Sequence, residues 1–197
     1  MLDEIDPAAR LIGAVNTVVN RQGRLIGYNT DGLGFLRSLA EDLHFLCGGK
    51  RILLLGAGGA CRAALVSLAQ AGAASIAIAN RTRSRAEALV GEFRDLFPAT
   101  GFDASGIEKD EFLRAIQGID LVNTSAVGLK GESPLRISPG PAWPAMLPFT
   151  TWSTTRRAPL VLETLRRGHP ASGGLGMLAG QAKRPSPYGP VAGLWPV

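Results

Sequence analysis

Five small residues between an aliphatic run and a helical pattern could bind a phosphate. They are Gly56, Ala57, Gly58, Gly59 and Ala60. Glycines let the backbone turn tightly and leave N–H groups uncovered at the start of a helix, where these donors and the helix dipole favour an anion. The third position of the dinucleotide fingerprint is Cys61 rather than glycine, so the spacing alone also fits a purely structural turn. The strand and helix patterns on either side favour a dinucleotide site.

A polar and basic segment follows the next aliphatic run and bears on the choice of dinucleotide. It consists of Asn80, Arg81, Thr82, Arg83, Ser84 and Arg85. An NAD site usually has a carboxylate here, which binds the ribose 2′-hydroxyl. Guanidinium groups suit a phosphate instead, so the segment predicts NADP. The alternative is a solvated basic start of a helix.

Alternating patterns between residues 51 and 125 indicate the elements that position these groups. We expect strands at 52–55, 75–79 and 119–122, and helices at 62–71, at 84–93 and around Phe112 to Ile116. Gly72 would end the first of these helices. Such alternation predicts an α/β fold with a Rossmann-like, doubly wound parallel sheet. Thr124 and Ser125 follow the last strand, at the edge where such sheets bind ligands.

The flanking segments predict further elements. We expect a short helix within 1–12, strands at 13–20 and 25–28, a helix from Asp31 with Asn29, Thr30 or Asp31 as its N-cap, and helices at 159–167 and 173–181. The domains would be 1–30 as the remnant of a substrate-binding domain, 31–158 as the NADP-binding domain with a linking helix at 31–43, 159–182 as C-terminal helices on the substrate side, and 183–197 as an irregular tail.

Composition excludes several classes of protein. The 197 residues are 46% hydrophobic and 19% charged, as in an ordinary globular protein. No apolar run reaches the roughly 18 residues of a membrane span, and no signal-peptide pattern opens the chain, so we expect no membrane partner and a cytoplasmic location. Cys47 and Cys61 read as reduced, buried thiols without metal-site spacing. The net charge of +5 is scattered, so we expect no nucleic-acid partner.

Six motifs in order resemble the shikimate dehydrogenase family. They are Gly13-Ala14-Val15-Asn16-Thr17, Asn29-Thr30-Asp31-Gly32, the five residues from Gly56 to Ala60, Asn80-Arg81-Thr82, Asn123-Thr124-Ser125, and Gly174-Leu175-Gly176-Met177-Leu178 with Gln181. The resemblance covers about residues 2 to 182. It implies NADPH-dependent reduction of 3-dehydroshikimate to shikimate in aromatic amino acid biosynthesis, and it leaves room for a homodimer.

The resemblance also implies roles for individual residues. Asn16 and Asp31 would bind the substrate hydroxyls, and Gln181 would approach from the closing lobe. The loop from Gly56 to Ala60 would hold the pyrophosphate, residues 80–85 the adenosine phosphate, and Gly174 the nicotinamide end. Asp31 is also the aspartate of the family's Lys–Asp catalytic pair, in which the lysine supplies a proton to the alkoxide left by hydride transfer.

The lysine of that pair has no counterpart here. The family carries it in an Asn-Val-Thr-x-Pro-x-Lys motif, which does not occur upstream of Asn16. Lys50 cannot replace it, because it precedes the first Rossmann strand at the edge remote from the ligand. We therefore expect a chain N-terminally truncated relative to the family, with impaired turnover. The alternatives are a non-catalytic NADP-binding fragment or decayed gene product, and a quinate/shikimate dehydrogenase that uses NAD.

A second departure lies at 149–154, where the family typically has a buried Val-Tyr-Asp-Met-Val-Tyr strand. This chain reads Phe-Thr-Thr-Trp-Ser-Thr there, which one-base displacement of the family's codons would produce. We hypothesise a local frame shift across 148–157 and another after Gln181; ordinary divergence is the alternative. Because buried hydroxyls need hydrogen-bond partners, we expect this last strand to be weak or absent.

Overall fold

A six-stranded parallel sheet dominates the computed structural model, which describes residues 1–124, 147–152 and 159–182. Its strands, in spatial order, are β6 (Gly101–Ser105), β5 (Ser75–Ala79), β4 (Arg51–Leu55), β7 (Leu121–Thr124), β8 (Phe149–Thr151) and β9 (Ala171–Ser172). Numbered along the sheet's own chain order, this is 3-2-1-4-5-6, the doubly wound Rossmann arrangement. The predicted fold class is confirmed.

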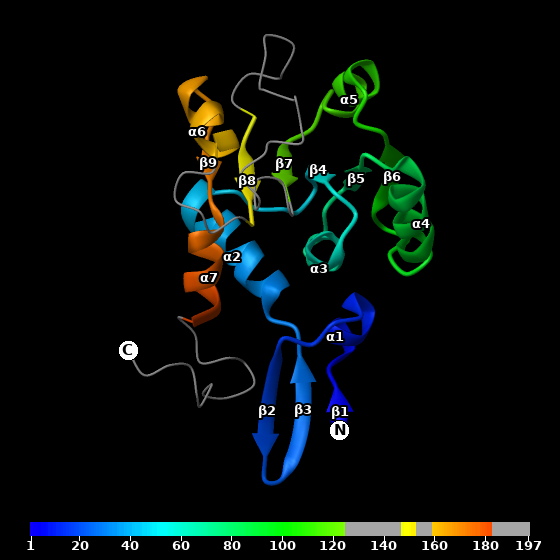
Figure 1. Ribbon diagram of the computed structural model, residues 1–197, viewed down its shortest axis with the longest axis vertical. Helices are drawn as coiled ribbons and strands as arrows, with labels where there is room; N and C mark the ends of the chain where they lie inside the picture. The colour runs from blue at the N-terminus through cyan, green and yellow to red at the C-terminus, as the bar shows by residue number, and fades with distance from the viewer. Residues whose placement is uncertain (125–146, 153–158, 183–197) are drawn as a thin grey trace.

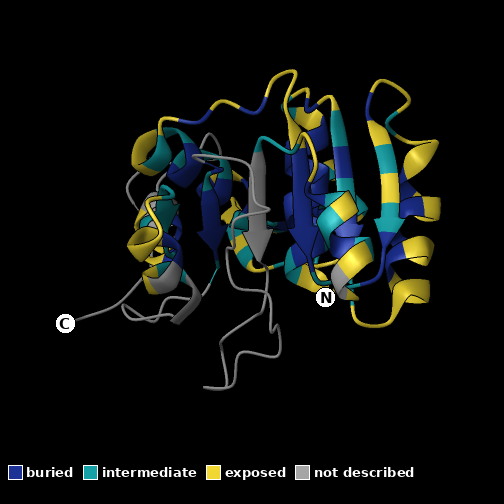
Figure 2. Ribbon diagram, turned by 90° about the horizontal axis from the view of Figure 1, so that it is seen from above, coloured by how far each residue is buried: buried dark blue, intermediate teal, exposed yellow. Residues whose placement is uncertain are grey.

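Helices cover both faces of this sheet. One face packs against α2 (Asp31–Leu43), α3 (Gly59–Gln70), α4 (Arg83–Arg94) and α7 (Gly174–Ala182), and the other against α5 (Lys109–Ala115) and α6 (Pro159–Arg166). Residues alternate between the faces along each strand, so Leu54 points to the first cluster and Leu53 to the second. The central strands are accordingly buried, as Figure 2 shows.

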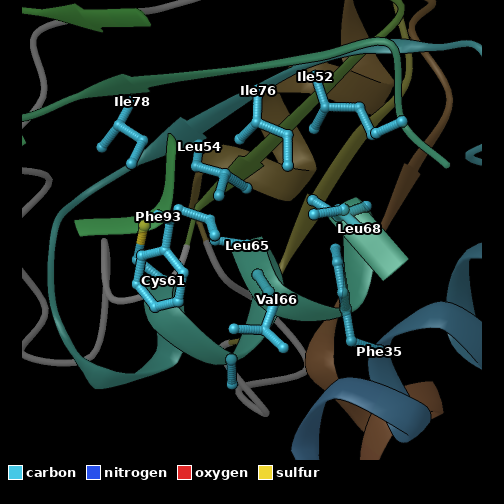
Figure 3. Packing of buried hydrophobic residues seen from close by; sticks show 14 of the residues in the cluster. Phe35, Ile52, Leu54, Cys61, Leu65, Val66, Leu68, Ile76, Ile78 and Phe93 are labelled. Atoms are coloured by element: carbon cyan, nitrogen blue, oxygen red, sulfur yellow. The ribbon is translucent and has the colours of Figure 1, made fainter. Parts of the chain in front are cut away.

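The first cluster is the main core, and α3 lies at its centre. Leu65 and Leu68 of α3 pack beneath Ile52, Leu54 and Ile76 of the strands (Figure 3). All five side chains have no exposed surface, which is why β4 reads as an unbroken aliphatic run. Gly72, with φ of 78°, follows the C-cap of α3 as predicted.

A second, three-stranded sheet precedes the large one. It has the order β1 (Glu4–Ile5), β3 (Arg24–Tyr28) and β2 (Thr17–Arg21), with α1 (Pro7–Ile12) between β1 and β2. The predicted hairpin is present and turns at Gln22 and Gly23, although β2 begins at Thr17 rather than at residue 13. Strand β1 was not expected. Figure 1 shows this sheet below the large one, joined to it through α2.

The carboxyl-terminal half of the large sheet differs from expectation. The strand expected to be weak or absent exists as β8, whose three residues pair with both β7 and β9. Thr150 and Thr151 are each 3% exposed, and Phe149 is buried. The expectation failed because threonine is β-branched and suits a strand, while the ladder itself uses backbone groups.

Strand β9 lies beyond residue 158, the predicted end of the nucleotide-binding domain. The outermost strand of the sheet therefore comes from the segment assigned to the C-terminal helices. It pairs in register with β8, and the N–H of Phe149 donates to the carbonyl of Pro170 at 2.8 Å. The predicted irregular tail at 183–197 lies outside the described residues. Within the described part of the chain, no helix is both long and apolar enough to cross a membrane.

Candidate functional site

The carboxyl ends of the central strands meet at one edge of the sheet. The register places Leu55 of β4 opposite both Ala79 of β5 and Thr124 of β7. Gly56 and Asn80, which follow the first two strands, therefore lie at the same edge. The chain leaves β4 and β7 in opposite directions, and the crevice at such a switch point is where doubly wound sheets bind their ligands.

The glycine loop leaves open space in front of α3. Gly56 has φ of 110°, which favours glycine, and its N–H donates to the carbonyl of Ala79 at 2.8 Å. Gly58 is the N-cap of α3 and supplies no side-chain acceptor to the first turn. A Cβ atom built on Gly58 or Gly59 would meet nothing within 4 Å. The first N–H groups of α3 thus remain available to an anion.

The other small residues of this loop lie closer to the core. Ala57 and Ala60 are half-buried, and Cys61 is fully buried in the cluster that contains Phe93 (Figure 3). A side chain larger than cysteine would collide with this packing, which explains a small residue at the third fingerprint position. Cys47 is also buried, and both thiols are free, as the sequence predicted.

Both thiols are expected to resist alkylation in the folded protein. Burial raises the pKa of Cys61 to about 12 and that of Cys47 to about 11, from an ordinary value of 9.0, so the nucleophilic thiolate is scarce. Unfolding should expose two rapidly reacting thiols, counted with a chromogenic disulfide reagent. Because the unfolded thiols ionise at lower pH than the folded ones, stability should also fall as the pH rises above about 9. Rapid labelling of the native chain would contradict the burial.

The basic segment begins where β5 ends. The N–H of Asn80 donates to the carbonyl of Ser105 at 3.1 Å, and the Asn80 side-chain amide donates to the carbonyl of Thr82 at 2.8 Å. These bonds shape the turn into α4. Arg81 and Arg85 are exposed, and within the described residues neither has a recorded ion pair. Thr82, the N-cap of α4, and Ser84 are also exposed.

Arg83 differs from the two neighbouring arginines because it already has partners. Its guanidinium binds Glu87 at 2.8 Å and Glu111 at 2.8 Å. The hydrogen bond to Glu87 and the charge of Glu111 raise the pKa of Arg83 above its usual range. Arg81 and Arg85 are thus more readily available to a phosphate than Arg83 is.

The predicted substrate residues come together at the junction between the small sheet and α2. The side-chain oxygen of Asn16 accepts hydrogen bonds from the N–H of Thr30 at 3.0 Å and from the hydroxyl of Thr17 at 3.0 Å. This orientation turns the Asn16 Nδ2 donor outward, and no acceptor for it is recorded among the described residues. Asp31 is half-buried in the first turn of α2, where the helix dipole favours a carboxylate.

Gly32 lets the start of α2 approach α3 closely. A Cβ atom built on it would lie 1.7 Å from Ser67 Oγ, 3.0 Å from Ser67 Cβ and 3.3 Å from the carbonyl of Ala63. Rotation of the serine hydroxyl relieves only the first of these contacts. Gly32 therefore determines how near Asp31 comes to the nucleotide-binding helix.

Gly32→Ala is expected to lower the free energy of unfolding by about 1–3 kcal/mol, the usual cost of overpacking. Ser67→Gly in the same chain should recover part of the loss, because it removes both serine atoms that the new methyl group meets. Chemical denaturation of the two single variants and the double variant measures this coupling. Additive losses would mean that the two helices do not meet as described.

The remaining predicted residues are placed less completely. Gly174 is buried at the start of α7, directly after β9, and Gln181 lies in the last turn of the same helix. The backbone of Thr124 ends β7, whereas Ser125 lies outside the described residues. Lys50 immediately precedes β4, at the edge opposite the glycine loop, as the sequence predicted.

Two features of this region were missed by sequence reasoning. The Trp152 ring follows β8 and packs against Phe35 of α2, with ring centroids 5.6 Å apart. Arg62 of α3 reaches across to α1. The helical pattern around 62–71 predicted only the apolar face of α3, and nothing in the spacing indicated the partners of its polar side chains. Among the described residues, no group of three or more metal-ligating side chains occurs.

Comparison with known proteins adds independent findings. The family model for shikimate/quinate 5-dehydrogenases matches residues 38–126. A shikimate dehydrogenase (NADP⁺) from Geobacter metallireducens is 46% identical over 189 residues, covering 93% of this chain and 64% of that protein. A second one, from Geobacter sulfurreducens, is 44% identical with the same coverage. The chain therefore spans about 64% of the length of these relatives.

Solved structures give the same picture. A shikimate 5-dehydrogenase from Listeria monocytogenes, in complex with shikimate and NAD, has a TM-score of 0.81 and 32% identity, covering 92% of this chain and 65% of that one. One from Thermus thermophilus, in complex with NADP(H) and shikimate, has a TM-score of 0.73 and 34% identity over 91% and 63%. A 5-ketofructose reductase from Gluconobacter has a TM-score of 0.76 and 36% identity over 91% and 64%.

Proposed function

Since this chain belongs to the shikimate dehydrogenase family, we propose that it binds NADP(H) at the carboxyl edge of its parallel sheet and a hydroxylated six-membered-ring acid beside Asn16 and Asp31. The reaction would be reduction of 3-dehydroshikimate to shikimate in the cytoplasm. The observation that carries the proposal is the open glycine loop at the start of α3, aligned with the arginines that follow β5.

In this proposal the glycine loop and the first turn of α3 hold the pyrophosphate. When bound, the cofactor supplies the hydride. Arg81 and Arg85 would pair with the adenosine phosphate, because neither has a recorded ion pair in the described residues. Gly174 would border the nicotinamide end, and Thr124 with Ser125 would line the crevice from β7.

The substrate side would use donors and acceptors of opposite kind. The outward Nδ2 of Asn16 would donate to a ring hydroxyl oxygen, and the Asp31 carboxylate would accept from a hydroxyl hydrogen. Gln181 would close over the ring from α7. Hydride addition to the carbonyl leaves an alkoxide that needs a proton. Because the sequence has no Asn-Val-Thr-x-Pro-x-Lys motif, we infer that turnover is slow and that binding exceeds catalysis.

Two measurements test the proposal. Titration of the chain with NADPH and with NADH, followed by nicotinamide fluorescence, should give tighter binding of NADPH. A spectrophotometric assay with shikimate and NADP⁺, repeated with quinate and NAD⁺, then separates the candidate reactions. Absence of NADPH binding would overturn the proposal, and tighter NADH binding would favour the quinate/shikimate dehydrogenase alternative.

A second candidate function is an NADP-binding protein without catalysis, favoured by the absence of the lysine motif. It predicts NADPH binding with no absorbance change in any of the four substrate and cofactor combinations. A positive control is the full-length shikimate dehydrogenase from Geobacter metallireducens, the 46% identical relative. Any shikimate-dependent reduction of NADP⁺ that Asp31→Asn abolishes would exclude this second function.

A further inference from the structure

Arg62 of α3 completes the hydrogen bonding of another helix, α1. Its Nε donates to the carbonyl of Ile12 at 2.9 Å, and its Nη2 donates to the carbonyl of Leu11 at 3.2 Å. The last carbonyls of a helix have no partner within that helix. Gly13, at φ of 75°, donates to the two preceding carbonyls, those of Ala9 and Arg10. Arg62 therefore satisfies the two carbonyls that the C-cap leaves over.

The guanidinium is held in place from the opposite side by α4. Glu92 accepts from Nη1 at 2.5 Å and from Nη2 at 2.7 Å, and the guanidinium carbon lies 5.0 Å from the ring centroid of Phe93. Two carbonyls, a bidentate carboxylate and an aromatic face thus engage one planar group. A lysine ammonium could not match this geometry, because it lacks the planar fork.

The end of α1 that Arg62 caps leads directly into the substrate-side loop. Ala14 follows the cap, and its carbonyl accepts from the side chain of Asn29 at 3.2 Å. Asn16 comes two residues later and accepts from the N–H of Thr30. Arg62 lies four residues after Gly58, so one turn of α3 separates the phosphate loop from this contact. The same helix therefore touches both halves of the proposed site.

We propose that Arg62 is a positioning residue that fixes the small β1–β3–β2 sheet and α1 against the nucleotide-binding helix, and so sets where Asn16 lies relative to the nicotinamide. The fixing of the small sheet is a statement about the free protein. Its consequence for substrate binding rests on the proposed function, so the two are tested separately.

The first test measures the distance between the two parts of the molecule. Spin labels go on Val18→Cys in β2 and Gln70→Cys at the end of α3, which are exposed positions, while the two native thiols are buried. Arg62→Met keeps the length of the side chain but removes its donors. We expect a broadened or displaced distance distribution for Arg62→Met and for Arg62→Lys. Distributions identical to that of the parent would overturn the proposal.

Arg24→Met is the matched control for this test. Arg24 pairs with Glu4 at 3.3 Å within the small sheet, so its loss removes an arginine–carboxylate pair without touching α3. It should leave the distance distribution unchanged. If both variants broaden the distribution equally, loosening of the small sheet itself explains the result and the role of Arg62 in positioning is refuted. Melting temperatures of all variants show whether each chain is folded.

The second test separates substrate from cofactor binding. Arg62→Met should weaken shikimate binding in the presence of NADP⁺ about tenfold or more, as expected for displaced binding groups, and change NADPH affinity little. Equal weakening of both ligands would overturn the coupling between Arg62 and Asn16. If the parent binds neither ligand, the proposed function fails, while the distance measurement still decides whether Arg62 fixes the small sheet.

Discussion

Gly58→Ala is expected to lower the affinity for NADPH about a hundredfold, because the new methyl group would occupy the space through which a phosphate reaches the first N–H groups of α3. Gly58 has φ of −100° and ψ of −173°, which alanine also adopts, and no atom lies within 4 Å of the built Cβ. The folded protein should therefore tolerate the change. Losing two charge-assisted hydrogen bonds costs about 3 kcal/mol, which corresponds to that factor.

Gly91→Ala is the matched control for this variant. A Cβ at Gly91 also meets nothing within 4 Å, but Gly91 lies inside α4, away from the glycine loop. It should raise stability by about 0.5–1 kcal/mol, since alanine is the better helix former, and leave NADPH affinity unchanged. Gly58→Ala should cost no more than about 1 kcal/mol, because alanine is a poorer N-cap than glycine. Unchanged NADPH affinity in Gly58→Ala would mean that no phosphate binds at this loop.

Arg81→Ala is expected to weaken NADPH binding about tenfold to a hundredfold and to leave NADH binding unchanged. The two cofactors differ only in the phosphate on the adenosine ribose, and a hydrogen bond between charged groups contributes about 1.5–3 kcal/mol. Isothermal titration with both cofactors measures the difference. The comparison is internal, because any general disturbance of the loop would weaken both nucleotides together.

Arg83→Ala provides the contrast to Arg81→Ala. Arg83 already binds Glu87 and Glu111, so a phosphate would have to compete with two carboxylates. We expect a smaller loss of NADPH affinity than for Arg81→Ala. Asn80→Asp tests the opposite change, because a carboxylate at the end of β5 should favour NADH through the ribose hydroxyl. A larger loss for Arg83→Ala than for Arg81→Ala would assign the phosphate to Arg83 instead.

Strands and helices with strong periodicity could be predicted from the sequence, whereas weakly patterned ones could not. The aliphatic run of β4 and the recurring leucines of α2 each indicated their element, because burial on both faces or on one face leaves a clear pattern. Strand β6, Gly-Phe-Asp-Ala-Ser, lies at the edge of the sheet and has no such run. The two-residue strands β1 and β9 are too short to leave a pattern.

The sequence by itself determined the local chemistry of the candidate site: a glycine loop before a helix, guanidinium groups after the second strand, and the Asn16 and Asp31 motifs. These follow from residue types within a few positions of one another. Only the tertiary structure decided which groups are available, since Arg83 is engaged by a carboxylate of α5 whereas Arg81 is not. It alone brought Arg62 to the end of α1, because contacts between residues fifty positions apart depend on how the helices pack and leave no periodic signal in the sequence.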